Sequence, residues 1–293
     1  MLIDAHNHLH DAWLAPHQAK LLAELAAAGV SYAVVNGTCE TDWPDVARLA
    51  GKTAPGLTLL PSYGLHPWDV GNRSPDWQKN LLGALGLEGA PVSTGTAHGA
   101  APRMMGEFGL DRWILDRARA DDWRLTGLRR APLEEQSEAF LWQLELAAAH
   151  NLPASIHCID AWGQLHDLLR NSRRPTRGFL LHAYSGPDEM VKPFADLGAF
   201  FSFNGSFLEP RRTRLRELFS RVPADRLLVE TDAPAMRLPA ALEKFPPLPT
   251  PDGRLANHPA NLATTYEALA QLRGVTFEDL AGQVEGNFRR LFL

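Results

Sequence analysis

The sequence predicts an α/β fold, a distorted (β/α)8 or TIM barrel that forms a single domain over residues 1–293. Three observations support this prediction. The length is typical of this barrel as one unit, and short apolar segments alternate with segments of helical spacing along the chain. Several of the apolar segments end in a histidine or a carboxylate, and polar groups gather at the carboxyl ends of the strands in this architecture. No internal repeat or linker divides the chain.

The first third of the chain predicts three strands and two helices. Leu2 and Ile3 begin a short buried strand, and Gly29 is placed to end the first helix. The turn at 64–67 contains His66 and follows the third strand. In order, we expect a strand at 2–8, a helix at 16–28, a strand at 32–36, a helix at 42–52 and a strand at 57–63.

The middle of the chain contains the segments with the least periodicity. Residues 83–102 are rich in Gly, Ala, Pro, Ser and Thr, so we expect a loop, with His98 as a loop histidine rather than a ligand. The charged segment 112–130 is expected to be an excursion on the rim where the strands end, because barrels tolerate insertions there. The elements expected here are a strand ending at 104–111, a helix at 133–150, a strand at 153–157 and a helix at 161–169.

The last third of the chain continues the alternation of strands and helices. Residues 234–251 are rich in proline, which removes backbone donors, so we expect a mostly irregular loop over the mouth of the barrel. Two helices close the chain. The elements expected here are strand 178–182, helix 188–197, strand 199–203, helix 211–221, strand 226–232, helix 260–272 and helix 277–291.

Composition restricts the class of protein. The net charge is −5, and proteins that bind long duplexes by neutralising phosphates normally carry a basic surface, so we expect no stable duplex binding. The two cysteines, Cys39 and Cys158, cannot form a disulfide framework, and no apolar run approaches the ~20 residues that cross a bilayer. Nothing resembles a secretory signal, so we expect a cytoplasmic protein without a membrane span.

Polar side chains end five of the expected strands. Because side chains alternate along an extended segment, His6 and His8 project to the same side and supply two nitrogen ligands for a divalent ion. Parallel barrel strands place their carboxyl ends on one rim, so the other polar ends are expected to join them. The six candidate metal ligands are His6, His8, Glu107, His157, His182 and Asp232. Six ligands, with a carboxylate able to bridge, fit two metal ions better than one.

Each candidate also has a purely structural interpretation. A histidine such as His157 or His182 after an apolar strand is often a hydrogen-bonded core residue. Glu107 is harder to explain in this way, because a buried carboxylate is costly unless a charge or a metal compensates it. Glu230 and Asp232 fall on the same side of their strand, and the pattern does not distinguish which of them belongs to the metal site.

An ordered series of short motifs resembles the TatD family of metal-dependent hydrolases. The motifs run from residue 2 to residue 292 and are IDAHNH, GLHP, GEFGLD, PASIH, LLHAYSG, FSFNGSF, VETDAP, NHPANL and NFRRLF. The resemblance implies a barrel of the amidohydrolase type with DNase or 3′-to-5′ exonuclease activity on single-stranded DNA or a related substrate. The expected partner is therefore a small nucleic-acid or phosphodiester substrate.

The resemblance also implies a role for each polar residue. One ion would be held by His6, His8, Glu107 and Asp232, and a second by Glu107, His157 and His182. His66 is expected near the scissile group and is a candidate for substrate binding. Weaker candidates for supporting or rim positions are Asp111, Asn36 and Ser185.

The sequence departs from the family pattern at two cationic positions. Members commonly have an arginine two residues after the histidine of the fifth strand, where this chain has Ile159. The arginine that usually precedes Asn-x-Pro is replaced by Ala256. Arg254 and Arg211 are the candidates that could compensate as substrate-binding groups.

The expected mechanism uses two divalent ions, Mg2+, Mn2+ or Zn2+, bridged by Glu107, to activate a water for attack on a phosphorus or carbonyl centre. Asp232 would orient this water and accept its proton, and His66 would protonate or stabilise the leaving oxygen. Eight tryptophans are open to two interpretations: those near rim loops, Trp68, Trp77 and Trp113, stack bases or pack the outer helices.

Two alternatives remain open from the sequence. The same chemistry would serve an ester or amide hydrolase, such as an aminoacyl-tRNA deacylase or an amidohydrolase. The amidohydrolase bridge of a carbamylated lysine is not available, because the fourth strand presents Glu107 and the lysines fall in helices or loops. A metal-binding barrel that has lost turnover and acts as a binding module is the alternative from another class, supported only by the missing arginines.

Overall fold

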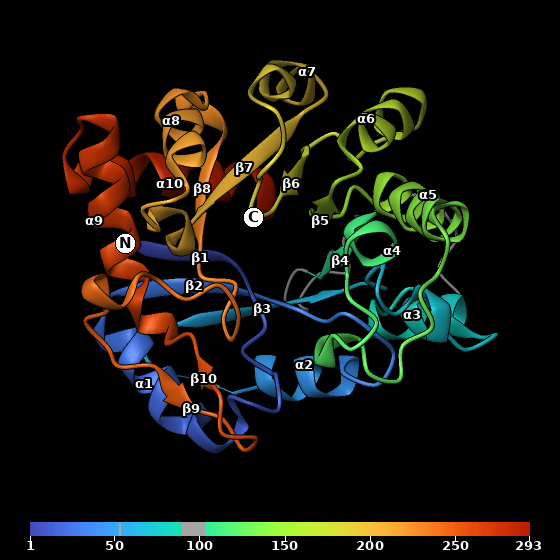
Figure 1. The fold of residues 1–293 in the computed structure, drawn as a ribbon, viewed down its shortest axis with the longest axis horizontal. Helices are drawn as coiled ribbons and strands as arrows, with labels where there is room; N and C mark the ends of the chain where they lie inside the picture. The colour runs from blue at the N-terminus through green and yellow to red at the C-terminus, as the bar shows by residue number, and fades with distance from the viewer. Residues whose placement is uncertain (53, 89–102) are drawn as a thin grey trace.

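The structure is a computed structural model that describes residues 1–52, 54–88 and 103–293. Eight parallel strands form one sheet in the order of the chain (Figure 1). They are β1 (Leu2–Asn7), β2 (Val30–Asn36), β3 (Thr58–Tyr63), β4 (Met104–Asp111), β5 (Ala154–Ile159), β6 (Phe179–Leu181), β7 (Ala199–Asn204) and β8 (Leu227–Glu230). Beyond the end of β8 the backbone N–H of Asp232 donates to the carbonyl of His6 at 3.0 Å, and that of His8 donates to Ala233 at 2.8 Å. These bonds join the last strand to the first, and the predicted barrel is confirmed.

The helices, apart from one short helix on the rim, cover the outside of the strands (Figure 1). They are α1 (Gln18–Ala27), α2 (Trp43–Ala50), α3 (Trp77–Ala84), α4 (Trp113–Asp116), α5 (Leu133–His150), α6 (Trp162–Asn171), α7 (Val191–Asp196), α8 (Thr213–Arg221), α9 (Leu262–Arg273) and α10 (Phe277–Phe292). Short 3-10 turns join them at η1 (Ala15–His17), η2 (Val70–Asn72), η3 (Trp123–Leu125), η4 (Asp188–Met190), η5 (Gly205–Leu208), η6 (Ala224–Arg226), η7 (Ala240–Leu242) and η8 (Pro259–Asn261).

The last helix shows how local sequence sets these elements. Thr276 caps α10 by accepting a hydrogen bond from the N–H of Asp279 at 3.0 Å. Leu280, Val284 and Phe288 follow at intervals of four residues, so they lie on one side of the helix, and all three are buried. The amphipathic spacing thus holds α10 against the barrel.

The sequence does not predict α3. Only Trp77 and Leu81 of this short helix are buried, and Gly83 lies inside it, so it has little apolar periodicity to detect. The loop expected at 83–102 therefore begins inside α3. The rest of that expectation, including His98, lies outside the described residues.

Two rim segments contain more regular structure than expected. The excursion at 112–130 includes α4 and the 3-10 turn η3. In the proline-rich segment, β9 (Leu248–Pro249) pairs with β10 (Leu255–Ala256) in a small antiparallel hairpin. Both segments follow strands β4 and β8, so both lie on the rim where the strands end.

Glycines let neighbouring strands approach closely beneath the rim. Gly109 of β4 pairs with His157 of β5, and a Cβ at Gly109 would lie 1.9 Å from the carbonyl oxygen of His157. A Cβ at Gly64 would lie 2.5 Å from the carbonyl oxygen of Glu107. Only glycine fits such contacts, and they bring the segments that contain His66, Glu107 and His157 together.

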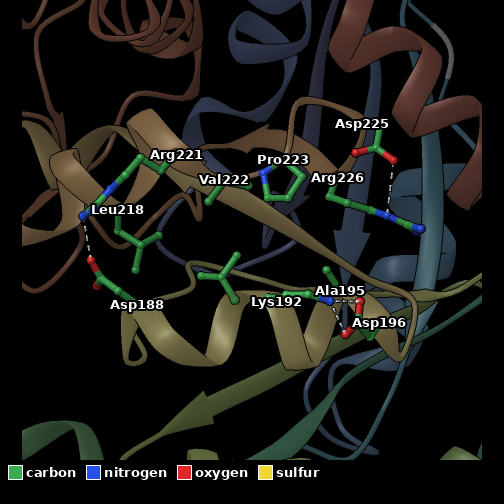
Figure 2. A pocket seen from close by; sticks show the side chains of 11 residues that line it. Asp188, Lys192, Ala195, Asp196, Leu218, Arg221, Val222, Pro223, Asp225 and Arg226 are labelled. Atoms are coloured by element: carbon green, nitrogen blue, oxygen red, sulfur yellow. Dashed lines mark hydrogen bonds and ion pairs between the residues drawn. The ribbon is translucent and has the colours of Figure 1, made fainter.

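The outer layer contains a cavity of about 510 Å3 between α7 and the turn that follows α8 (Figure 2). Its charged groups pair at its edges, Asp188 with Arg221 at 3.0 Å and Lys192 with Asp196 at 2.7 Å. None of the predicted site residues lines it. Among the described residues, no helix combines the length and the apolar character needed to cross a membrane.

Candidate metal centre

Seven polar side chains converge where the strands end. His6, Glu107 and His157 lie inside β1, β4 and β5, whereas His8, His66, His182 and Asp232 lie in the residues that follow β1, β3, β6 and β8. All are buried except His8, which is partly exposed. The structure therefore brings together all six predicted metal ligands and His66, from six different strands.

The first cluster forms around Oε2 of Glu107. This oxygen lies 3.3 Å from Nε2 of His6 and 3.2 Å from Nε2 of His8. Oδ1 of Asp232 is 3.7 Å from the first of these nitrogens and 3.3 Å from the second. Two imidazole nitrogens and two carboxylate oxygens thus surround one point.

The second cluster forms around the other oxygen of Glu107. Oε1 lies 2.9 Å from Nδ1 of His157 and 2.8 Å from Nε2 of His182, and these two nitrogens are 3.2 Å apart. Nε2 of His66 lies 3.3 Å from the same oxygen. The rings of His6 and His182 stack with their centroids 3.9 Å apart. Glu107 therefore divides its two oxygens between two adjacent sets of nitrogen donors.

The outer nitrogens of the histidines are held by neighbouring groups. Nδ1 of His8 lies 2.7 Å from the carbonyl oxygen of Asn36, which can only accept, so Nδ1 carries the proton. Nε2 of His157 lies 3.1 Å from Oδ2 of Asp111, which likewise accepts from it. In a neutral ring the inward nitrogen of each histidine then presents a lone pair to the carboxylates.

A cation fits these inward lone pairs. Lone pairs of His8 and His157 lie within 3.3 Å of carboxylate oxygens, an unfavourable arrangement unless a proton or a metal ion lies between them. Nitrogen and carboxylate donors suit Zn2+, and carboxylates also suit Mg2+ and Mn2+. The donor set therefore fits divalent ions at both clusters.

The hydrogen-bonding role of His66 differs from that of His8 and His157. Its Nδ1 accepts the backbone N–H of Trp68 at 3.2 Å, so a neutral ring carries its proton on Nε2, the nitrogen that faces Glu107. Burial and the nearby charge of His157 lower the pKa of His66. His66 thus points a hydrogen-bond donor at the centre, whereas His8 and His157 point acceptors.

Electrostatics in the centre are dominated by Glu107. Burial alone would raise the pKa of this carboxyl, but the charges of His182, His66 and His6 hold it well below its usual value. Burial lowers the pKa of His8, yet hydrogen bonds with Asp232 and Glu107 raise it well above the usual range. In the absence of ions, protons on the histidines thus compensate the carboxylates.

The structure distinguishes Glu230 from Asp232. β8 ends at Glu230, whose carboxylate accepts hydrogen bonds from the hydroxyl of Ser202 and from Nδ2 of Asn204 inside the barrel. Asp232 follows in the left-handed region, with φ +52°, which turns its side chain to the rim. The alternation of side chains fails here because the strand ends two residues before its predicted end.

The residues predicted for supporting, rim and substrate-binding positions lie at different distances from the metal centre. The backbone carbonyl of Asn36 and the side chain of Asp111 support histidines, as described. Ser185 lies on the rim, where its carbonyl accepts from Arg214 at 2.7 Å. Arg211 is exposed between η5 and α8. Arg254 is exposed in the β9–β10 hairpin and lies over the ring of Trp123.

One supporting residue is missed by the sequence reasoning. Oγ of Ser155 lies 2.8 Å from Nδ1 of His6, the nitrogen that faces away from the carboxylates. Ser155 and His157 are two residues apart in β5, so they share one side of the strand. That period-two relationship to a candidate ligand is a signal that could have found it.

The family model of the TatD related DNase matches residues 3–293. The chain belongs to this family. The match confirms the resemblance inferred from the motifs, and with it the prediction of a metal-dependent hydrolase of the TatD type.

Known TatD proteins are similar to almost the whole chain. The 3′-5′ ssDNA/RNA exonuclease TatD of Klebsiella pneumoniae is 38% identical over 93% of this chain and 90% of its own length. An uncharacterized metal-dependent hydrolase of Escherichia coli, YcfH, is 27% identical over 99% of this chain and 95% of its own. Among solved structures, the TatD homologue YjjV of E. coli superposes with a TM-score of 0.78 at 26% identity, covering 99% of this chain and 97% of that one.

Proposed function

We propose that this TatD protein hydrolyses phosphodiester bonds of single-stranded DNA or RNA, as a 3′-to-5′ exonuclease, with two divalent ions held in its metal centre. The observation that carries the proposal is the division of Glu107: one carboxylate oxygen faces His6 and His8, and the other faces His157 and His182. The exonuclease name of the Klebsiella relative, at 38% identity, supports this substrate class.

The residues present would hold the ions in two sets. The first ion would be held by His6, His8, Glu107 and Asp232, and the second by Glu107, His157 and His182. Mg2+, Mn2+ and Zn2+ all suit these donors. Bound ions of this kind lower the pKa of a water and polarise a phosphoryl oxygen. Because the first ligands lie at the end of β1 and the last follows β8, we treat residues 1–293 as one hydrolase domain.

The chain's own groups orient the water, accept its proton and stabilise the leaving oxygen. Asp232 is at the mouth, 8% exposed, with its Oδ1 at 3.3 Å from Nε2 of His8, and it orients the attacking water and accepts its proton. His66 carries a proton on Nε2 beside Oε1 of Glu107, and this N–H donates a hydrogen bond that stabilises the leaving oxygen. Glu107 remains ionised throughout, since its pKa is held far below neutrality.

The test compares metal content and hydrolysis in matched variants. Glu107→Ala and Asp232→Asn are assayed on a single-stranded oligonucleotide with Mg2+, Mn2+ or Zn2+, beside the exposed control Glu189→Gln. The proposal expects Glu107→Ala to lose metal and activity, and Asp232→Asn to lose activity by a factor of about 10²–10⁴. Unchanged metal and activity in both variants would contradict it.

The substrate panel separates the alternatives. Aminoacyl esters and amides are assayed in parallel with the oligonucleotide and a phosphotriester. Cleavage of an ester or amide faster than the oligonucleotide would favour an ester or amide hydrolase that uses the same metal centre. Binding of metal and oligonucleotide with no cleavage of any substrate would favour the binding module instead.

A further inference from the structure

Two groups of stacked side chains stand on the rim beside the metal centre. In the outer group, the rings of Trp13 and Trp123 stack with centroids 5.5 Å apart, at 27° between planes. The guanidinium of Arg254 lies 3.4 Å from the centroid of Trp123 and 6.0 Å from that of Trp13. These residues come from the segments after β1, β4 and β8, up to 241 positions apart.

The inner group has the same composition. The rings of Trp68 and Trp113 stack with centroids 6.1 Å apart, at 23° between planes. The guanidinium of Arg124 lies 4.7 Å from the centroid of Trp113 and 5.8 Å from that of Trp68. Trp123 and Arg124 are consecutive residues of η3, so this short turn joins the two groups. We call the six residues together the stacking row: Trp13, Trp68, Trp113, Trp123, Arg124 and Arg254.

The inner end of the stacking row contacts the metal centre. Nε1 of Trp68 donates to Oδ2 of Asp111 at 2.6 Å, and the same oxygen lies 3.1 Å from Nε2 of His157. The ring of His66 lies edge-on to Trp68, with centroids 5.7 Å apart. The row therefore runs from Asp111 and His66 at the centre outward to the excursion at 112–130 and the β9–β10 hairpin.

The outer end of the row is exposed, whereas Trp13, Trp68 and Trp113 are partly buried. Trp123 leaves 46% of its surface exposed, and Leu255, next to Arg254 in the chain, leaves 53%. Trp77, by contrast, is buried and packs edge-on against Trp142 in the outer layer, with centroids 4.9 Å apart. Exposed aromatic surface beside a catalytic centre is typical of a binding surface.

Charge on the row favours stacking over phosphate binding. Arg124 is paired with Asp122 at 2.6 Å, and Arg254 is paired with Asp252, so each guanidinium already has a carboxylate partner. The pairs hold the guanidiniums over the rings but leave little net positive charge. The exposed surfaces of Trp123, Arg124 and Arg254 are aromatic and guanidinium surfaces, and unpaired bases stack on surfaces of this kind whatever their sequence.

We propose that the stacking row binds the unpaired bases of a single strand whose terminal phosphodiester lies at the metal centre. This inference rests on the proposed function and specifies how the strand is held in a chain that lacks the two usual arginines. It predicts a preference for single strands, because the bases of a duplex are stacked on each other and cannot stack on Trp123. Affinity then comes from the bases more than from the phosphates.

The binding test uses the whole chain in a chelator, with a fluorescent single-stranded octanucleotide and an abasic strand of the same length and charge. Wild type is expected to bind the octanucleotide at least tenfold more tightly than the abasic strand, with weak dependence on salt. Trp123→Ala is expected to lose about tenfold in affinity for the octanucleotide, the order for one stacked base, and to bind the abasic strand unchanged. Trp123→Phe should restore most of the loss. The control is Val275→Ala, an exposed apolar residue between α9 and α10.

The kinetic test uses a mononucleotide ester and oligonucleotides of increasing length. Trp123→Ala should raise KM for the oligonucleotides and leave kcat and the mononucleotide ester unchanged. Equal binding of intact and abasic strands, or a lower melting temperature in Trp123→Ala with unchanged KM and affinity, would overturn the inference. Absence of cleavage in wild type would count against the proposed function alone, since the binding test does not depend on turnover.

Discussion

Oδ2 of Asp111 lies 3.1 Å from Nε2 of His157, and the ring turns its other nitrogen to Oε1 of Glu107 at 2.9 Å. The carboxylate therefore fixes which nitrogen of His157 carries the proton and which faces the centre. Partners of this kind orient metal-binding histidines and increase their basicity. Asp111 acts on the centre through His157, without contacting the predicted position of the ions.

Asp111→Asn is expected to weaken binding of one ion. A neutral amide accepts a weaker hydrogen bond and can rotate, so the ring of His157 loses its fixed orientation. We expect a loss of about 10- to 100-fold in metal affinity, measured by competition with a chelator. Asp116→Asn is the control, because this exposed carboxylate pairs with Arg112 on the surface at 2.7 Å. Equal affinities in the two variants would exclude a supporting role for Asp111.

His8→Ala and His182→Ala are expected to remove different ions. His8 faces Oε2 of Glu107 and His182 faces Oε1, so each variant loses donors from one cluster only. We expect metal analysis to show about two ions for wild type and about one for each variant at limiting metal concentration. His166→Ala, a partly buried histidine of α6, is the control with full metal content. A single ion in wild type would refute the division into two clusters.

Gly109→Ala is expected to destabilise the fold. Its Cβ would lie 1.9 Å from the carbonyl oxygen of His157, so β4 or β5 must shift. Overpacking of this kind costs roughly 1–3 kcal/mol in the free energy of unfolding. In Gly286→Ala a Cβ meets nothing within 4 Å on α10, and removing a helical glycine should stabilise by about 0.5–1 kcal/mol. Urea denaturation measures the free energy of unfolding of both variants. An unchanged value for Gly109→Ala would show that the strands do not require this close contact.

Asp69 is expected to make stability depend on pH. Burial, with the charges of Asp42 and Glu107, raises the pKa of Asp69 from 3.8 to about 7. The folded state therefore holds the proton of Asp69 more tightly than the unfolded chain does. The contribution of this proton to the free energy of unfolding is complete below about pH 4 and is lost as pH rises to about 7.

Replacing the carboxyl of Asp69 by an amide removes the cost of ionising this group in the folded state. Relative to wild type, Asp69→Asn should increase the free energy of unfolding at pH 8 by roughly 2–4 kcal/mol, with no difference below pH 4. Denaturation in a chelator at several pH values measures this, with Asp76→Asn as an exposed control. A difference that does not vary with pH would contradict the shifted pKa.

The positions that the sequence predicts best are those fixed by period and topology. His6 and His8 share a side because β1 is extended, and the other ligands meet them because parallel strands end on one rim. The structure brings all six predicted ligands together for this reason, although they are separated by up to 226 positions.

Features that depend on where an element stops, or on contacts between distant segments, were harder to predict. Asp232 differs from Glu230 only because β8 ends between them, and no residue type marks that end. α3 lacks apolar periodicity, so its pattern resembles a loop. The contact of Arg254 with Trp123 joins two irregular segments, and spacing within either segment contains no information about the other.

The central claim is that Glu107 shares its carboxylate between two divalent ions. Anomalous diffraction from a crystal soaked in Mn2+ or Zn2+ tests it most directly. The account predicts two peaks per chain about 3.5–4 Å apart, one beside His6 and His8 and the other beside His157 and His182, each contacting one oxygen of Glu107. A single peak, or two peaks that Glu107 does not contact, would contradict it.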